Sequence, residues 1–140
     1  MSIKIFSIAT LCAGITMWGL AGVWHEVITV SFYTREVAAE HEGIGIIFIA
    51  YLILAALMVY LYTIINNGNG RLGEGLKFGA VIGLLWVFPH ELAMAGAHGE
   101  SISYVFKNAA WHVVEQGFGG IVIAFVYGRS NSLNRKSQCS

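Results

Sequence analysis

The histidines and glutamates are the residues of this sequence whose types and spacing predict chemistry. The chain of 140 residues has five histidines and eight acidic residues, and every acidic residue is a glutamate. Imidazole and carboxylate groups together are suitable ligands for Fe, Zn or Mn, and imidazole alone also binds Cu. Four histidines stand close to a glutamate, in the pairs His25-Glu26, His41-Glu42, His90-Glu91 and His112-Val113-Val114-Glu115. The sequence therefore predicts a transition-metal site with these eight residues as candidate ligands.

The spacing of His112 and Glu115 is the most specific of these signals. Residues three positions apart share one face of a helix, so the two side chains can reach a common ion. Di-iron helix bundles use two Glu-x-x-His motifs, and this sequence has only the reversed spacing, once. It contains no HExxH motif, and Cys12 and Cys139 stand far apart with no CxxC spacing, so soft ligands are not expected.

The elements that must position these residues are membrane helices. The sequence is 56% hydrophobic and 11% charged, whereas an average soluble domain is about 25% charged. This composition excludes disorder, a basic nucleic-acid-binding surface and an ordinary soluble enzyme. About 20 continuous apolar residues are needed to span about 30 Å of hydrocarbon as a helix. Four segments meet that requirement, at Ile5–Phe32, Ile44–Ile65, Leu76–Ala97 and Ala109–Tyr127.

These segments predict an all-α fold, an integral membrane four-helix bundle over residues 1–128. They are continuous apolar runs, not the alternating ten-residue strands of a membrane barrel. The first segment is longer than the apolar core of a signal peptide, so we expect it to be retained. The polar tail, residues 129–140, is expected to be cytoplasmic and irregular.

The basic residues predict the orientation in the membrane. Six of the eight lie on one side, namely Lys4, Arg71, Lys77, Arg129, Arg135 and Lys136, and only Arg35 and Lys107 lie on the other. The positive-inside rule then places both termini in the cytoplasm. All five histidines and seven of the eight glutamates fall in the outer half, so the metal site is expected near the outer face. Glu36, Glu40, His98 and Glu100 are expected to be solvated there.

The chain also resembles itself. Residues 23–27 resemble residues 88–92 at an offset of 65, and residues 41–51 resemble residues 115–125 at an offset of 74. This pattern predicts two helical hairpins that enter from the same side, a parallel repeat with its axis along the membrane normal. His25 is then expected to superpose on His90, and His41 on Glu115.

Small-residue stripes predict which helix faces are in contact. Gly75, Gly79, Gly83 and His90 fall on one stripe of the third segment, and Thr10, Gly14, Trp18, Gly22 and His25 on one stripe of the first. Because small residues let membrane helices approach closely, we expect His25 and His90 to point into the helix contact. His41, His112 and Glu115 are also expected to point inward, with Glu26, Glu42 and Glu91 at the edge. Pro89 is expected to kink its helix.

Several functions remain open at this level. The first is a His/Glu-ligated transition-metal site of Fe, Zn or Cu, which is either a redox-active, oxidoreductase-type site or a structural metal site, and the pattern does not decide whether it is catalytic. A heme held by His25 and His90 is the alternative cofactor. The alternative function is a non-catalytic accessory subunit of a membrane redox complex, whose polar cluster packs helices or contacts quinone, heme or pigment. The expected partners are membrane lipid and either further copies of the chain or other membrane subunits, with no nucleic acid.

Overall fold

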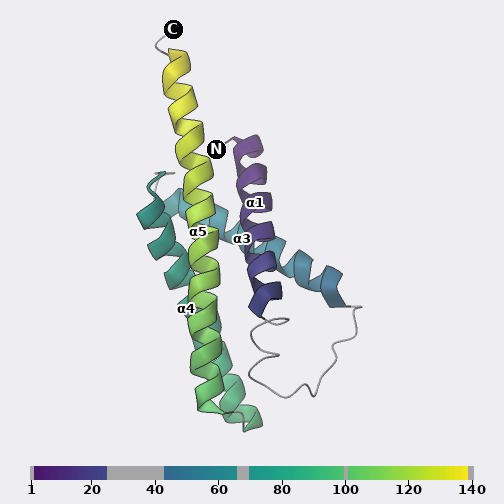
Figure 1. Cartoon of the computed structure of the whole chain (residues 1–140). Helices are drawn as coiled ribbons and strands as arrows, with labels where there is room; N and C mark the ends of the chain where they lie inside the picture. The colour runs from purple at the N-terminus through teal and green to yellow at the C-terminus, as the bar shows by residue number, and fades with distance from the viewer. Residues whose placement is uncertain (1, 25–42, 66–69, 100, 139–140) are drawn as a thin grey trace.

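A computed structural model describes residues 2–24, 43–65, 70–99 and 101–138, the side chains of 133–138 excepted. Over these ranges the chain forms four helices and no strands (Figure 1), namely α1 (Ile3–Val23), α3 (Ile44–Ile65), α4 (Leu72–His98) and α5 (Ile102–Gln138). All four are long and apolar enough to cross a membrane. The prediction of an all-helical, multi-pass integral membrane protein is therefore confirmed.

The helix boundaries agree with the apolar segments only in part, because α4 begins four residues and α5 seven residues before the expected start, and the expected end of the first segment, Phe32, lies outside the described residues. The bounds of α3 are those expected, whereas α5 continues through the polar tail to Gln138. The expectation of an irregular tail is therefore wrong. Residues 129–138 contain no proline, and extending an existing helix adds one hydrogen bond for each residue that is ordered. Helix α4 likewise continues through Pro89 as one helix.

The turn between α4 and α5 depends on a glycine. Gly99 follows the last residue of α4 with φ 72° and ψ 28°, the left-handed conformation that side chains with a Cβ disfavour. Its backbone N–H donates to the Ala95 carbonyl over 2.9 Å, which satisfies one carbonyl of the last helical turn. The helix therefore ends at a residue that can reverse the chain direction.

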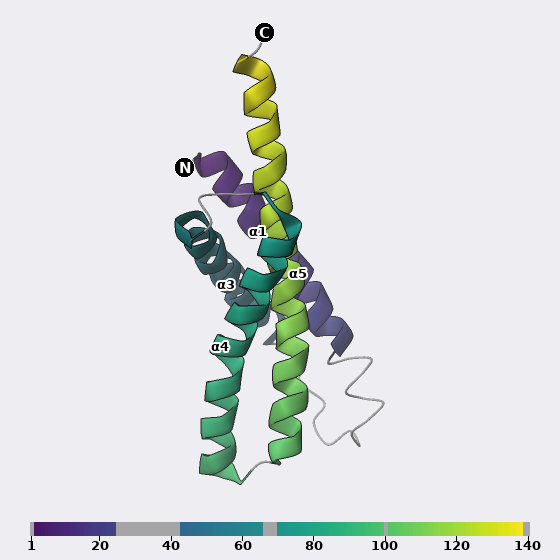
Figure 2. The ribbon, with the colours of Figure 1, turned by 90° about the vertical axis from the view of Figure 1, so that its left-hand side faces the viewer.

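Helix α5 is the element around which the others pack. Helices α4 and α5 run side by side along the length of α4 (Figure 2), whereas α1 packs on both α5 and α3. Helix α3 contacts α4 and α5 only slightly, and it crosses α1 obliquely (Figure 1). Its apolar side chains are widely exposed, as at Ile46 with 73% of its surface accessible, because lipid is the surrounding solvent.

The core joins α1, α3 and α5 and is closed toward α4 by aromatic rings. Met17 of α1, Met58 of α3 and Ile123 of α5 are fully buried. The Tyr62 ring of α3 meets the Phe78 ring of α4 edge-on, with 5.4 Å between centroids. This aromatic contact connects α3 to α4 at the end of the bundle that carries the chain termini.

The two hairpins of the predicted repeat pack in different ways. Close contact along the length of α4 holds it to α5, whereas α1 and α3 cross. His25 and His41 lie outside the described residues, so their superposition on His90 and Glu115 stays a prediction.

Candidate functional site

A buried polar cluster lies on α5, in the half of the helix that follows the α4–α5 turn. Glu115 and Gln116 are 0% and 1% exposed, although both lie in an apolar membrane-spanning helix. His112, one turn earlier, keeps 16% of its side chain accessible. Buried polar groups in a membrane helix are costly and usually have a structural or functional role.

The distances in this cluster connect all three side chains. The Nδ1 atom of His112 lies 3.6 Å from Oε2 of Glu115. The Gln116 amide Nε2 donates a hydrogen bond to the other carboxylate oxygen, Oε1, over 3.1 Å. The Tyr51 phenol of α3 interacts with the same carboxylate, so the cluster links α5 to α3. The prediction that His112 and Glu115 share a helix face is confirmed.

Some polar atoms of the cluster have no hydrogen-bond partner among the described residues. They are His112 Nδ1, Glu115 Oε2, Gln116 Oε1 and, one turn away, Trp111 Nε1. An unsatisfied polar atom in an apolar environment is unfavourable by a few kcal/mol. His112 Nδ1 and Glu115 Oε2 face each other, so a proton or a cation placed between them would satisfy both.

Three glycines of α4 let α5 come close enough to bury this cluster. A Cβ on Gly83 would lie 2.5 Å from the His112 carbonyl oxygen and 2.9 Å from the Gln116 side-chain oxygen. A Cβ on Gly79 would collide with the Gln116 carbonyl, and one on Gly75 with the Gly120 carbonyl. The backbones of α4 and α5 therefore meet directly along a ridge of residues spaced by four, which is the close packing that the glycine stripe predicts.

The expected orientation of His90 is wrong. Its side chain is exposed on α4, whereas Val87 and Ala95 are buried and Glu91 is half-buried. The expectation assumed that the contact continues from Gly83 by seven residues. The ridge instead advances by four residues at a time, through 83, 87, 91 and 95, and this places Glu91 on the ridge and His90 beside it.

The contact face of α1 also differs from the expected stripe. Gly14 is buried against Leu52 and Ala55 of α3, but Gly22 is exposed, and a Cβ added to it would meet no atom within 4 Å. Met17 instead lies against Gly119 of α5. The buried residues of α1 are spaced mainly by four, at Ala9, Ala13, Gly14, Met17 and Ala21.

Trp24, the last described residue before position 43, stacks on Trp111. The two ring centroids lie 4.7 Å apart and the ring planes differ by 11°. Because Trp111 directly precedes His112, this contact brings the end of α1 to the level of the polar cluster. The expected ligands His25, Glu26, His41 and Glu42 lie outside the described residues.

The described part of the chain brings together only two of the eight candidate ligands, His112 and Glu115. Within it, no group of three His, Cys, Asp or Glu residues is close enough to share one metal ion. The residues that the sequence did not single out are Gln116 and Tyr51. Gln116 lies four residues before Gly120 on the α4-facing ridge, so its position relative to the glycines was a usable signal. Tyr51 had no such signal, because only the folded chain brings it to Glu115.

Comparison of the chain with protein-family models, with curated proteins and with solved structures found no match.

Proposed function

We propose that this multi-pass membrane protein binds one transition-metal ion, with His112 and Glu115 as two of its ligands. The observation that carries the proposal is the 3.6 Å between His112 Nδ1 and Glu115 Oε2, both without a hydrogen-bond partner in the described chain. Two ligands at about 2.1 Å from a tetrahedral ion lie roughly 3.4 Å apart. The two atoms are therefore spaced for one ion with little rearrangement.

Further ligands are required, because one imidazole and one carboxylate do not complete a coordination shell. The candidates from this chain are the sequence-predicted His25, Glu26, His41 and Glu42, or the half-buried Glu91. Another copy of the chain or another membrane subunit is the remaining source, in keeping with the expected partners. Fe, Zn and Cu all bind imidazole and carboxylate ligands. Identification of the bound metal therefore decides whether the site has a redox role, because Fe and Cu are redox-active and Zn is not.

The heme alternative receives less support. It requires His25 and His90 to face each other across a wide slot, and the His90 side chain is exposed on α4. Where α4 meets α5, the glycine contacts bring the two backbones together and leave no slot between these helices.

The second candidate function is a non-catalytic accessory subunit of a membrane redox complex, with the cluster acting in helix packing. It is favoured by the hydrogen bond from Gln116 to Glu115 and by the interaction of Tyr51 with the same carboxylate. The hydrogen bond lies within α5, whereas the Tyr51 contact joins α3 to α5, and interhelical polar contacts of this kind stabilise membrane helix pairs by roughly 1 kcal/mol. In this role the cluster needs no ion.

Metal analysis of the protein purified in mild detergent separates the two candidates. We expect a stoichiometric metal in the wild type, its loss in His112→Ala and in Glu115→Gln, and its retention in His98→Ala. His98 is the matched control because it is an exposed histidine of α4. An optical spectrum of the same sample detects heme through its Soret band. Full metal occupancy in both α5 variants, or no metal in the wild type, would leave the packing role.

A further inference from the structure

A groove lies between α3 and α4, at the end of the bundle that carries Lys4 and Arg129 and away from the polar cluster. It has a volume of about 340 Å³. One residue of α3 and five of α4 line it, namely Ile65, Glu74, Lys77, Phe78, Val81 and Ile82. The groove exists because α3 and α4 touch only slightly here.

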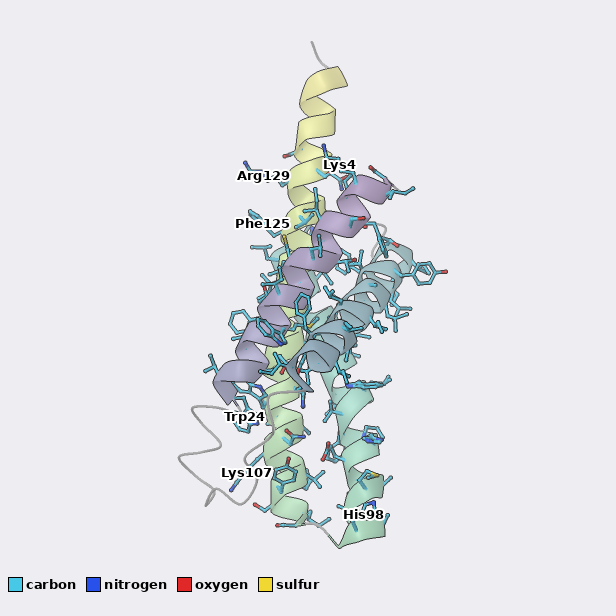
Figure 3. All side chains as sticks on the ribbon, turned by 90° about the vertical axis from the view of Figure 1, so that its right-hand side faces the viewer. Lys4, Trp24, His98, Lys107, Phe125 and Arg129 are labelled. Carbon is cyan, nitrogen blue, oxygen red and sulfur yellow. The ribbon has the colours of Figure 1, made fainter. Side chains whose placement is uncertain are left out.

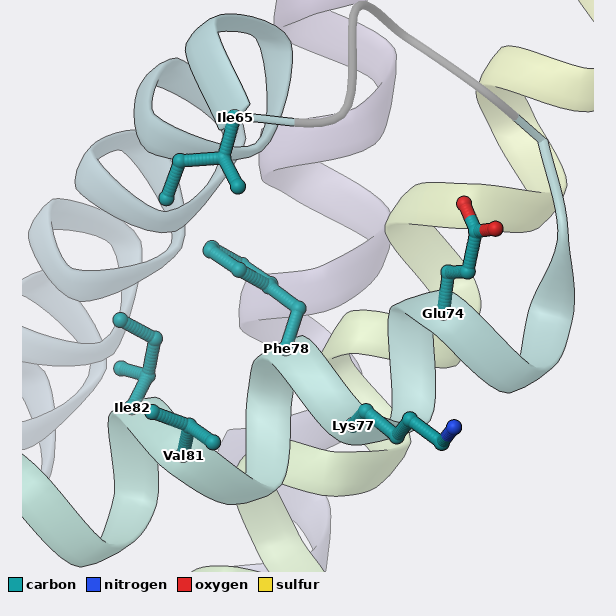
Figure 4. A pocket seen from close by; sticks show the side chains of 6 residues that line it. All are labelled: Ile65, Glu74, Lys77, Phe78, Val81 and Ile82. Atoms are coloured by element: carbon teal, nitrogen blue, oxygen red, sulfur yellow. The ribbon is translucent and has the colours of Figure 1, made fainter.

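The deep part of the groove is apolar and open to the membrane. Figure 4 shows the Phe78 and Ile82 side chains directed toward Ile65, across the space between the two helices. Val81 is 60% exposed, so this wall faces the surroundings of the protein. Because the groove lies between two membrane-spanning helices, hydrocarbon is the filling that its apolar walls favour.

The other part of the groove carries charge. The polar ends of Glu74 and Lys77 lie away from the apolar part (Figure 4). Glu74 accepts from Arg71, whose Nη1 is 3.3 Å from Oε1 of Glu74. Lys77 forms no salt bridge with a described residue. It lies five residues into α4, about 8 Å along the helix axis, from where a lysine can extend its ammonium to the membrane surface.

The charge around this end is positive. Figure 3 shows Lys4 and Arg129 at the same end of the molecule, and the contact of Gly70 with Gly128 brings the adjacent Arg71 to that end as well. Against these cations and Lys77, the only carboxylate of the described chain at this end is Glu74. An apolar groove under a basic rim is complementary to a lipid with an apolar chain and an anionic headgroup.

We propose that the α3–α4 groove binds one anionic phospholipid, with an acyl chain against Ile65, Phe78 and Ile82 and its phosphate at Lys77. The acyl chain fills the apolar part of the groove. The anionic headgroup forms the ion pair that Lys77 does not form with any described residue. A zwitterionic lipid can fill the apolar part with its acyl chain, but its headgroup has no net negative charge to offset that of Lys77. The site therefore selects lipids by headgroup charge.

Native mass spectrometry of the purified full-length protein, with phosphatidylglycerol or phosphatidylcholine added in mild detergent, tests this proposal. We expect one phosphatidylglycerol to be retained in preference to phosphatidylcholine. Lys77→Gln should reduce that preference about fivefold, the factor that corresponds to about 1 kcal/mol for one basic residue. Lys4→Gln, a cation of the same end that does not line the groove, should leave it unchanged.

A second pair of variants tests the apolar part. Val81→Trp fills the groove from an exposed position and should reduce retention of both lipids, whereas Leu84→Trp, exposed on α4 outside the groove, should not. Helical circular dichroism and a single elution peak verify folding of each variant. Equal retention of the two lipids by the wild type, equal effects of Lys77→Gln and Lys4→Gln, or no effect of Val81→Trp would each overturn the proposal.

Discussion

At the scale of single residues, Glu115 is the most unusual feature of the chain. It is 0% exposed, one carboxylate oxygen accepts from Gln116, and the other has no hydrogen-bond partner in the described chain. Burying a carboxylate without full compensation is unfavourable, and protein interiors usually place a partner charge or a metal beside it. A metal ion bound beside Glu115, as proposed above, would offset this cost.

We expect Glu115→Gln to raise the thermal midpoint of unfolding of the metal-free protein, because an amide keeps the shape and removes the burial of a charge. Glu115→Ala should instead lower stability by about 1–3 kcal/mol, because it leaves the buried Gln116 amide without its acceptor. Thermal denaturation in mild detergent with a chelator measures both. The control is Glu74→Gln, at the exposed end of α4, with little expected change. A Glu115→Gln midpoint below that of the wild type would assign the carboxylate a packing role.

At the scale of elements, the glycine ridge of α4 decides how deeply the α5 cluster is buried. Gly75, Gly79 and Gly83 each meet the α5 backbone so closely that a Cβ would overlap a carbonyl group or lie within 2.5 Å of it. Approach this close gains dispersion contacts along the whole helix pair, the main source of helix association in a membrane. The same approach covers Gln116 and one side of His112.

We expect Gly79→Ala to destabilise the protein by about 1–3 kcal/mol, because the new methyl group collides with the Gln116 carbonyl and pushes α4 away from α5. Gly73→Ala is the matched control on the same helix, since nothing lies within 4 Å of its Cβ position. Chemical or thermal denaturation of both variants in the same detergent gives the comparison. Equal stability of the two would show that α4 and α5 do not depend on this contact.

At the scale of the whole molecule, the structure sorts the charged residues into two ends. Lys4 and Arg129 lie at one end, and His98 and Lys107 at the other (Figure 3). Lys4 and Arg129, which the sequence analysis assigns to the cytoplasmic side, thus lie at the same end of the molecule. Most glycines of the two predicted stripes are used inside the protein, because Gly14, Gly75, Gly79 and Gly83 all face another helix. Gly19 and Gly22 of α1 are exposed, and a Cβ added to either would meet no described atom within 4 Å.

We expect both termini to be cytoplasmic, because the positive-inside rule places the more basic end there. A fluorescent reporter that folds only in the cytoplasm should be active when fused after Ser140, and a phosphatase that requires export should be inactive. The reverse pair of activities would invert the orientation and move the polar cluster to the cytoplasmic half. The lipid and metal proposals do not depend on this outcome.

The sequence by itself determined the helices and one part of the site. Apolar runs of about 20 residues have no stable form in a membrane except a helix or a closed barrel, so composition and length were enough to predict the fold class. The spacing of His112 and Glu115 predicted their proximity, because residues three apart on one helix meet whatever surrounds them. The glycine stripe predicted close packing for the same reason, since it depends on local periodicity.

Only the tertiary structure decided which helix each face meets. From Gly83, an advance of seven residues leads to His90 and an advance of eight leads to Glu91, and the sequence does not distinguish the two. Because α4 lies against α5 along a ridge of residues spaced by four, Glu91 is half-buried and His90 is exposed. Tyr51 reaches Glu115, and Trp24 stacks on Trp111, through contacts between helices far apart in the chain. Such contacts depend on crossing geometry, which arises from the packing of all the side chains together and leaves no periodic signal in any one segment.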